Sequence, residues 1–95
     1  MSSVVQHLPG QNRFIFEKDG KQVGLTDYAL HGHAIHITHT EVDPHLRHSG
    51  VGSEMVQEVV EAIRTSTDYR VVPDCPFALD WFERHPEYHE LELRG

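Results

Sequence analysis

The chain has 95 residues, of which 38% are hydrophobic and 24% charged, as in an ordinary globular protein. Its 15 acidic and 8 basic residues give a formal net charge of −7, which argues against a general nucleic-acid-binding surface. No long apolar run is present, so the sequence predicts neither a transmembrane span nor a membrane partner. The first residues lack the features of a secretory signal, and Cys75 has no second cysteine to pair with. We therefore expect a cytoplasmic protein with a single domain over residues 1–95.

The first half of the chain predicts an antiparallel meander of three strands. Residues 1–11 are polar and read as a loose lead-in. Asp19-Gly20 is a strong hairpin signal because both positions tolerate positive φ angles. Gly24 indicates a bulge or a close backbone contact. The predicted strands are 13–18, 21–30 and 33–42.

Pro44 ends the third strand, and from Gly52 the hydrophobic period changes to that of a helix of about three turns or slightly more. A short strand at 69–73 and a second helix at 77–84 follow, the latter with Phe77, Trp81 and Phe82 packing inward. The tail after Tyr88 has a further short strand as one option. The predicted order is βββαβα in an α/β (α+β) fold, with the last two strands parallel neighbours across the first helix.

The stretch from Val42 to Ser53 is the strongest candidate binding site. It combines the end of a strand, a basic loop with two glycines, and a helix start, where free backbone N–H groups favour phosphate. Arg47 adds a guanidinium suited to phosphate oxygens. The alternative is a plain strand-to-helix turn that needs glycines only for its geometry.

The segment Arg47-His48-Ser49-Gly50-Val51-Gly52 reads R-x-x-G-x-G, and Val42-Asp43-Pro44 precedes it. These residues resemble the motif of the GNAT superfamily of acyl-CoA-dependent N-acetyltransferases. The closer similarity is to very small, single-domain GNAT-like proteins, through His39-Thr40-x-Val42, Pro73-Asp74-Cys75 and the segment Arg84 to Tyr88. The resemblance covers roughly residues 13–90, the expected core of a minimal GNAT fold.

The resemblance implies acetyl-CoA or coenzyme A as co-substrate and an amine as acceptor. The pyrophosphate is then expected on the loop and the pantetheine arm beside the end of the third strand. Because no helices separate the first two strands, the acceptor site is expected to be open, as for a protein or peptide amine. The implied cofactor-binding residues are Val42, Arg47, His48, Ser49, Gly50, Val51, Gly52 and Ser53.

The catalytic residues are harder to predict, because the tyrosine that many GNAT enzymes use as an acid is replaced here by Phe82. We expect Cys75 to act instead, as a proton donor or as an acyl-accepting nucleophile. His39 is the predicted partner and His36 the second choice. A bulge is expected near the end of the third strand, and a bulge makes the faces of residues 39–42 unreadable from sequence.

Two other functions remain open at this point. The first is a non-catalytic module that binds coenzyme A or acyl-CoA. The second is a metal-binding or pH-responsive interaction protein built on the histidines of the third strand, although their spacing fits no tight ligand pattern and no metal is expected. The histidines concerned are His31, His33, His36 and His39.

Overall fold

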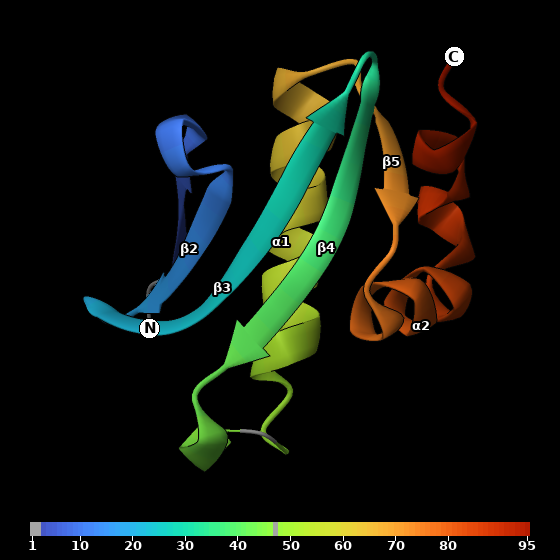
Figure 1. The fold of residues 1–95 in the computed structure, drawn as a ribbon. Coiled ribbons are helices and arrows are strands. Elements are labelled where there is room, and N and C mark those ends of the chain that lie inside the picture. The colour runs from blue at the N-terminus through green and yellow to red at the C-terminus, as the bar shows by residue number, and fades with distance from the viewer. Residues whose placement is uncertain (1–2, 47) are drawn as a thin grey trace.

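The computed structural model describes residues 3–46 and 48–95. It contains one five-stranded sheet in the order β1-β2-β3-β4-β5 (Figure 1). The first four strands are antiparallel neighbours, and β5 runs parallel to β4, as the strand–helix–strand step predicts. The elements are β1 (Ser3–Leu8), β2 (Arg13–Lys18), β3 (Lys21–His31), β4 (Ala34–Val42), α1 (Val51–Ser66), β5 (Arg70–Pro73), α2 (Pro76–Arg84) and three short 3-10 helices, η1 (Pro9–Gln11), η2 (Pro44–Leu46) and η3 (Pro86–Leu93).

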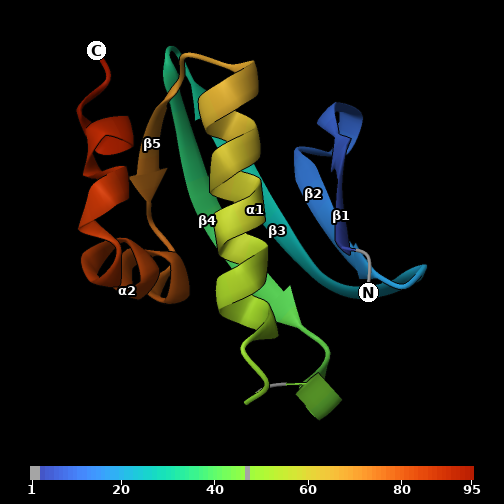
Figure 2. The same ribbon diagram turned by 180° about the vertical axis from the view of Figure 1, so that it is seen from behind.

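Helix α1 covers one face of the sheet, while α2 and η3 lie beside β5 (Figure 2). In the views shown, the described helices leave the other face of the sheet uncovered, and we call it the open face (Figure 1). The buried side of α1 is a stripe at helical spacing, as predicted. It belongs to the same buried core as the inward residues of β2, β3 and β4. Its members are Val51, Gly52, Met55, Val56, Val59, Val60 and Ile63.

The two predicted signals in the β2–β3 hairpin are confirmed. Asp19 and Gly20 have φ angles of 53° and 81°, which is the left-handed conformation that this turn requires. Gly24 makes a close contact, because a Cβ atom there would lie 2.8 Å from both the backbone oxygen of Glu41 and the sulfur of Met55. Only glycine therefore lets β3 approach β4 and α1 this closely.

Two sequence predictions at the chain ends were wrong in detail. The lead-in contains strand β1, which pairs antiparallel with β2 over six residues. Its side chains are mostly exposed, so it shows almost no hydrophobic pattern, and only the long-range pairing reveals it. The tail forms η3 instead of a strand, because Leu91 is buried while Leu93 is 82% exposed, contrary to strand alternation.

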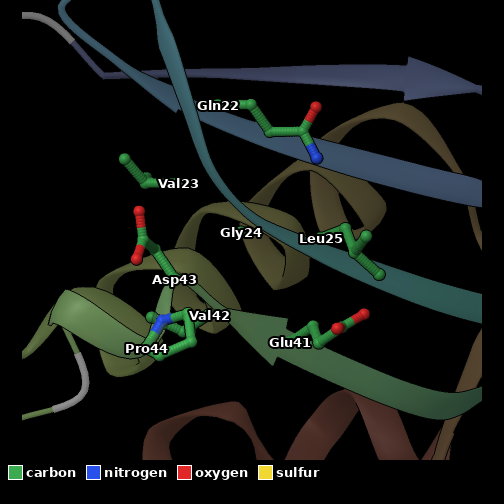
Figure 3. Close-up of a pocket in the computed structure, with 8 residues that line it drawn as sticks. All are labelled: Gln22, Val23, Gly24, Leu25, Glu41, Val42, Asp43 and Pro44. Carbon is green, nitrogen blue, oxygen red and sulfur yellow. The ribbon is translucent and has the colours of Figure 1, made fainter.

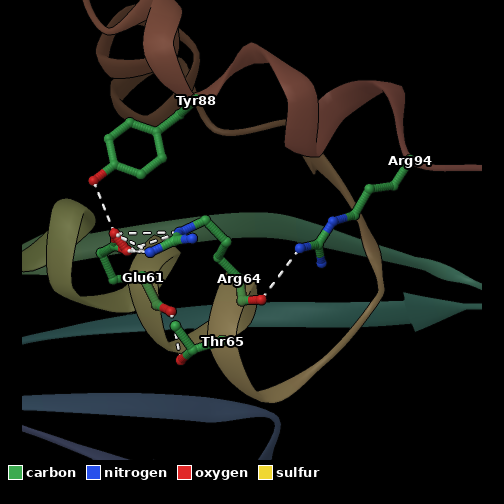
Figure 4. A network of polar contacts seen from close by, with 5 residues as sticks. All are labelled: Glu61, Arg64, Thr65, Tyr88 and Arg94. Carbon is green, nitrogen blue, oxygen red and sulfur yellow. Dashed lines mark hydrogen bonds and ion pairs between the residues drawn. The ribbon is translucent and has the colours of Figure 1, made fainter.

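Polar contacts hold the C-terminal segment to α1 (Figure 4). Arg64 donates to Glu61, and Tyr88 Oη donates to the same carboxylate at 3.2 Å. The hydrogen bonds from Arg64 lower the pKa of Glu61. Arg94 donates to the backbone oxygens of Arg64, Thr67 and Tyr69. These bonds place Leu91 against the core beside β5. None of the helices within the described ranges is long and apolar enough to cross a membrane.

We expect Gly24→Ala to lower the free energy of unfolding by about 1–3 kcal/mol, because the added methyl group meets backbone and a buried sulfur. Gly10→Ala is the matched control, since a Cβ atom there has no neighbour within 4 Å. Its effect should stay within about 0.5 kcal/mol. Urea unfolding of both variants measures the difference, and equal stabilities would contradict the packing described here.

Candidate functional site

The central feature of the candidate site is the point where β4 and β5 separate. Their parallel pairing extends from Ala34 opposite Arg70 to Ile37 opposite Pro73. The backbone oxygen of Ile37 then accepts hydrogen bonds from the N–H groups of both Asp74 and Cys75, each at 3.0 Å. Strand β4 continues to Val42, whereas the chain after β5 turns into α2. Residues 38–42 thus have no strand partner on this side within the described chain.

The predicted bulge in β4 lies just beyond this point. Asp27 pairs with His39 and Tyr28 with Ile37, so Thr38 is the extra residue. The inward positions therefore shift from odd to even numbers. Ile35 and Ile37 face α1 before the bulge, and Thr40 and Val42 do so after it, opposite Thr26 and Gly24 of β3. His39 and Glu41 consequently lie on the open face.

The predicted phosphate loop leads directly into α1. Gly50 is the residue before the helix and has a φ angle of 85°, a left-handed conformation that favours glycine. Because glycine has no side chain, Gly50 cannot accept hydrogen bonds from the N–H groups in the first turn of α1. The helix dipole adds positive potential at the same place. These groups belong to Val51, Gly52 and Ser53. Arg47, which was predicted to bind phosphate, lies outside the described residues.

A pocket of about 290 Å³ lies between the free part of β4 and the two helices. It is lined by Thr40 and Val42 from β4, His48 and Gly52 from the loop and α1, and Phe77 from α2. We call it the strand-split pocket. Phe77 is 45% exposed and does not pack inward as the sequence predicted. Its ring lies over Gly52, where a Cβ atom would be 2.7 Å from the ring's outer carbon.

A second hollow, of about 520 Å³, adjoins the other side of the loop. Its polar lining pairs Lys18 and Lys21 with two carboxylates, those of Asp19 and Asp43, and the loop adds His45 and Ser49. Lys18 also forms an ion pair with Glu54 of α1 at 2.8 Å. The two lysines were not predicted as site residues, because they are about thirty residues away from the loop in sequence.

A third pocket, of about 270 Å³, lies where β3 and the end of β4 meet (Figure 3). Val42 lines this pocket as well as the strand-split pocket. Glu41 and Asp43 bring carboxylates to its wall, and its described lining holds no lysine or arginine to offset them, which makes it a poor place for phosphate. The strand-split pocket, which includes the first turn of α1, suits an anionic ligand better.

Cys75 lies at the strand split, just before α2, and is 7% exposed. Its sulfur is 3.5 Å from the hydroxyl of Thr40, the first inward residue beyond the bulge. His39, the predicted partner, instead lies 3.4 Å from a carboxylate oxygen of Glu41. Its side chain is 55% exposed on the open face. The structure does not bring His39 and Cys75 together, because the bulge turns Thr40 inward in its place.

His36 has a closer relation to the split than His39. Its Nδ1 atom is 2.8 Å from the carboxylate of Asp74, the residue before Cys75. The His31 ring contacts the His36 ring edge to face, with centroids 4.9 Å apart. Because consecutive residues of an extended chain point to opposite sides, Asp74 meets His36 on the open face while Cys75 meets Thr40 on the α1 face. The split therefore carries an imidazole–carboxylate pair on one face and a thiol on the other.

Besides the two lysines of the hollow, sequence reasoning missed Thr40, Asp74 and Phe77 at the strand split. Asp74 could have been found, because it precedes Cys75 and follows a strand predicted to lie parallel to the strand that carries His36. Thr40 required the exact position of the bulge, which no local pattern gives. Within the described ranges, no group of three or more histidine, cysteine or acidic residues is arranged to hold a metal ion.

Trp81 connects α2 to the first turn of α1. It is 3% exposed, and its indole N–H donates to the Ser53 hydroxyl oxygen at 3.1 Å. Since the indole is only a donor, the Ser53 hydroxyl keeps its own proton for a second partner. His85 stacks on the indole with ring centroids 4.0 Å apart. Phe77 lies one turn earlier on α2, so this bond joins the helix that carries Phe77 to the first turn of α1.

We expect the Trp81–Ser53 bond to appear as a coupling of about 1 kcal/mol in a double-mutant cycle of Trp81→Phe and Ser53→Ala. Each single variant removes the bond, so the double variant should lose less stability than the two losses added together. Urea unfolding of the four proteins measures the coupling. Strictly additive losses would show that the bond contributes nothing.

A sequence model described as GCN5-related N-acetyl-transferase matches residues 13–91, nearly the whole chain. A search of curated proteins finds no match. The matched range contains the loop, the strand split and Cys75, and it ends at the buried Leu91.

Proposed function

This chain belongs to the GCN5-related N-acetyltransferase family, and on that basis we propose that it binds acetyl-CoA at the strand split and transfers the acetyl group to an amine. The observation that carries the proposal is the strand-split pocket. It joins the uncapped first turn of α1 to the free edge of β4 and ends near the Cys75 thiol. A ligand with a phosphate at one end and a thioester at the other fits this order of groups.

In this proposal the pyrophosphate lies on the N–H groups of Val51, Gly52 and Ser53, helped by Arg47 and His48. In the hollow on the other side of the loop, Lys18 and Lys21 are the groups that would bind the phosphorylated nucleotide end. The pantetheine arm follows β4, whose backbone groups beyond the bulge have no strand partner within the described residues. Strand-like pairing with the arm would satisfy those groups.

The reaction requires a nitrogen–carbon bond to form and the carbon–sulfur bond of the thioester to break. The amine loses one proton and the departing CoA thiolate gains one. We assign proton removal to His36, which Asp74 orients on the open face. We assign Cys75 to the thioester side, because its thiol lies on the α1 face with the pocket.

Cys75 has two roles that balance the reaction. As a proton donor, Cys75 protonates the departing CoA thiolate. The proton that the amine loses to His36 then returns to Cys75 through solvent. As a nucleophile, its thiolate takes the acetyl group and releases CoA, and the amine then attacks the new thioester and frees the cysteine. The open face is the side from which the amine arrives, because no described helix covers it in Figures 1 and 2. This access suits an acceptor as large as a protein or peptide.

The second candidate function is a module that holds acyl-CoA without transferring the acyl group. Two features favour it. Phe82 occupies the position of the tyrosine that many GNAT enzymes use as a general acid, and the thiol of Cys75 is nearly buried. Both functions need the same pocket and differ only at Cys75 and His36.

We expect coenzyme A and acetyl-CoA to raise the melting temperature, because they bind only the folded chain. At a hundredfold excess over Kd the stabilisation is about 2.7 kcal/mol. Gly52→Ala should weaken binding about tenfold or more, since the methyl group displaces Phe77 and narrows the pocket. Gly10→Ala serves as control and should bind like the parent chain. An absence of any shift with millimolar ligand would reject both candidate functions.

We expect the Cys75→Ala variant to bind coenzyme A but to lose acetyl transfer. Transfer to a panel of amines and peptides is measured by mass spectrometry. His36→Gln should lower the rate about 100-fold. His39→Gln should lower it less, because His39 lies with Glu41 away from the split. Incubation with acetyl-CoA alone separates the two roles of Cys75, because only the nucleophile gains the mass of an acetyl group. Unchanged transfer by Cys75→Ala would remove Cys75 from the reaction.

A further inference from the structure

A separate cavity of about 380 Å³ lies at the opposite end of α1 from the strand split. Its walls come from β1, β2 and β3 on one side and the last turns of α1 on the other, elements that face each other in Figure 2. Ala62 and Ser66 line it, whereas Gly52 lines the strand-split pocket, so the two sets of lining residues are about 15–21 Å apart along the helix. We call it the β1–α1 cavity.

The wall of this cavity is apolar and aromatic. Phe14, Tyr28, Ile35 and Ile63 are each less than 10% exposed, while Pro9, Asn12 and Ser66 form an exposed rim. None of the described lining residues is an acid, a lysine or an arginine. An ion would therefore leave water without gaining a countercharge, which selects for a neutral ligand.

One polar pair interrupts the apolar wall. The Tyr28 hydroxyl is 2.7 Å from His7 Nε2, and the His7 ring stacks on Phe14 with centroids 4.3 Å apart. His7 lies among the exposed side chains of β1, and its partial desolvation lowers its pKa, while burial raises the pKa of Tyr28, so both groups are uncharged at pH 7. When Tyr28 donates to the neutral imidazole, its oxygen keeps a lone pair for one further donor.

We propose that the β1–α1 cavity is a second binding site, for a small neutral aromatic molecule that donates one hydrogen bond to Tyr28. The size agrees with ligand sites in proteins, which are concave, mostly apolar and contain a few placed polar groups. The aromatic rings of Phe14, Tyr28 and Tyr69 provide surfaces for an aromatic partner. The site does not depend on coenzyme A binding, because it shares no lining residue with the strand-split pocket.

Phenol and toluene test this assignment, because they have the same size and differ in the hydroxyl donor. Amide spectra of the labelled full chain should show saturable shifts at Asn12, Tyr28 and Ser66 with phenol, at a Kd on the order of 1 mM. Toluene should bind about fivefold more weakly. In Tyr28→Phe the two probes should bind equally, because the accepting oxygen is gone.

A second test of the proposal is to fill the cavity with a larger side chain. Ala62→Leu places extra carbon atoms in the cavity and should abolish the phenol shifts while coenzyme A binding is unchanged. Ser66→Leu at the exposed rim replaces it if the first variant does not fold. Equal binding of phenol and toluene to the parent chain would overturn the proposal. So would shifts centred on Gly52, shifts that persist in the filled variant, or no saturable shift up to about 10 mM phenol.

Discussion

The separation of β4 from β5 at Ile37 is the constraint on which the rest of the site depends. The carbonyl oxygen of Ile37 accepts hydrogen bonds from the N–H groups of both Asp74 and Cys75, and the parallel pairing ends at Ile37. The bulge at Thr38 then turns Thr40 towards α1. Together these two features place a free strand edge and a helix start around one pocket, with the Cys75 thiol in contact with Thr40 in its wall.

The site residues on α2 are held by packing that extends to the C-terminus. The Trp81 indole ties α2 to Ser53, and η3 closes the core through Leu91. The Glu61, Arg64 and Tyr88 contacts then fix η3 to α1. Because a small domain buries only a small core, each packed segment contributes much of its stability. The last ten residues therefore support the geometry of a pocket that they do not line.

Much of this fold could be predicted from local signals. The 3.6-residue period gave α1, and Asp19-Gly20 gave the hairpin, because both patterns act over a few residues. β1 could not be found, since its stability comes from pairing with β2 and it has little pattern of its own. At the site, Gly50 and Gly52 could be located from the loop motif, and their binding of coenzyme A stays a prediction. The pairing of Cys75 with Thr40, and of His36 with Asp74, depends on the bulge and on the meeting of distant strands.

An amide spectrum recorded during titration with acetyl-CoA tests the central claim most directly, because it locates the ligand residue by residue. The account predicts saturable shifts at Gly50 to Ser53 and along Thr40 to Val42, with smaller changes at Cys75 and Phe77. Saturable shifts confined to the end of α1 near Ser66, or the absence of any saturable shift, would contradict the assignment of the strand split as the coenzyme site.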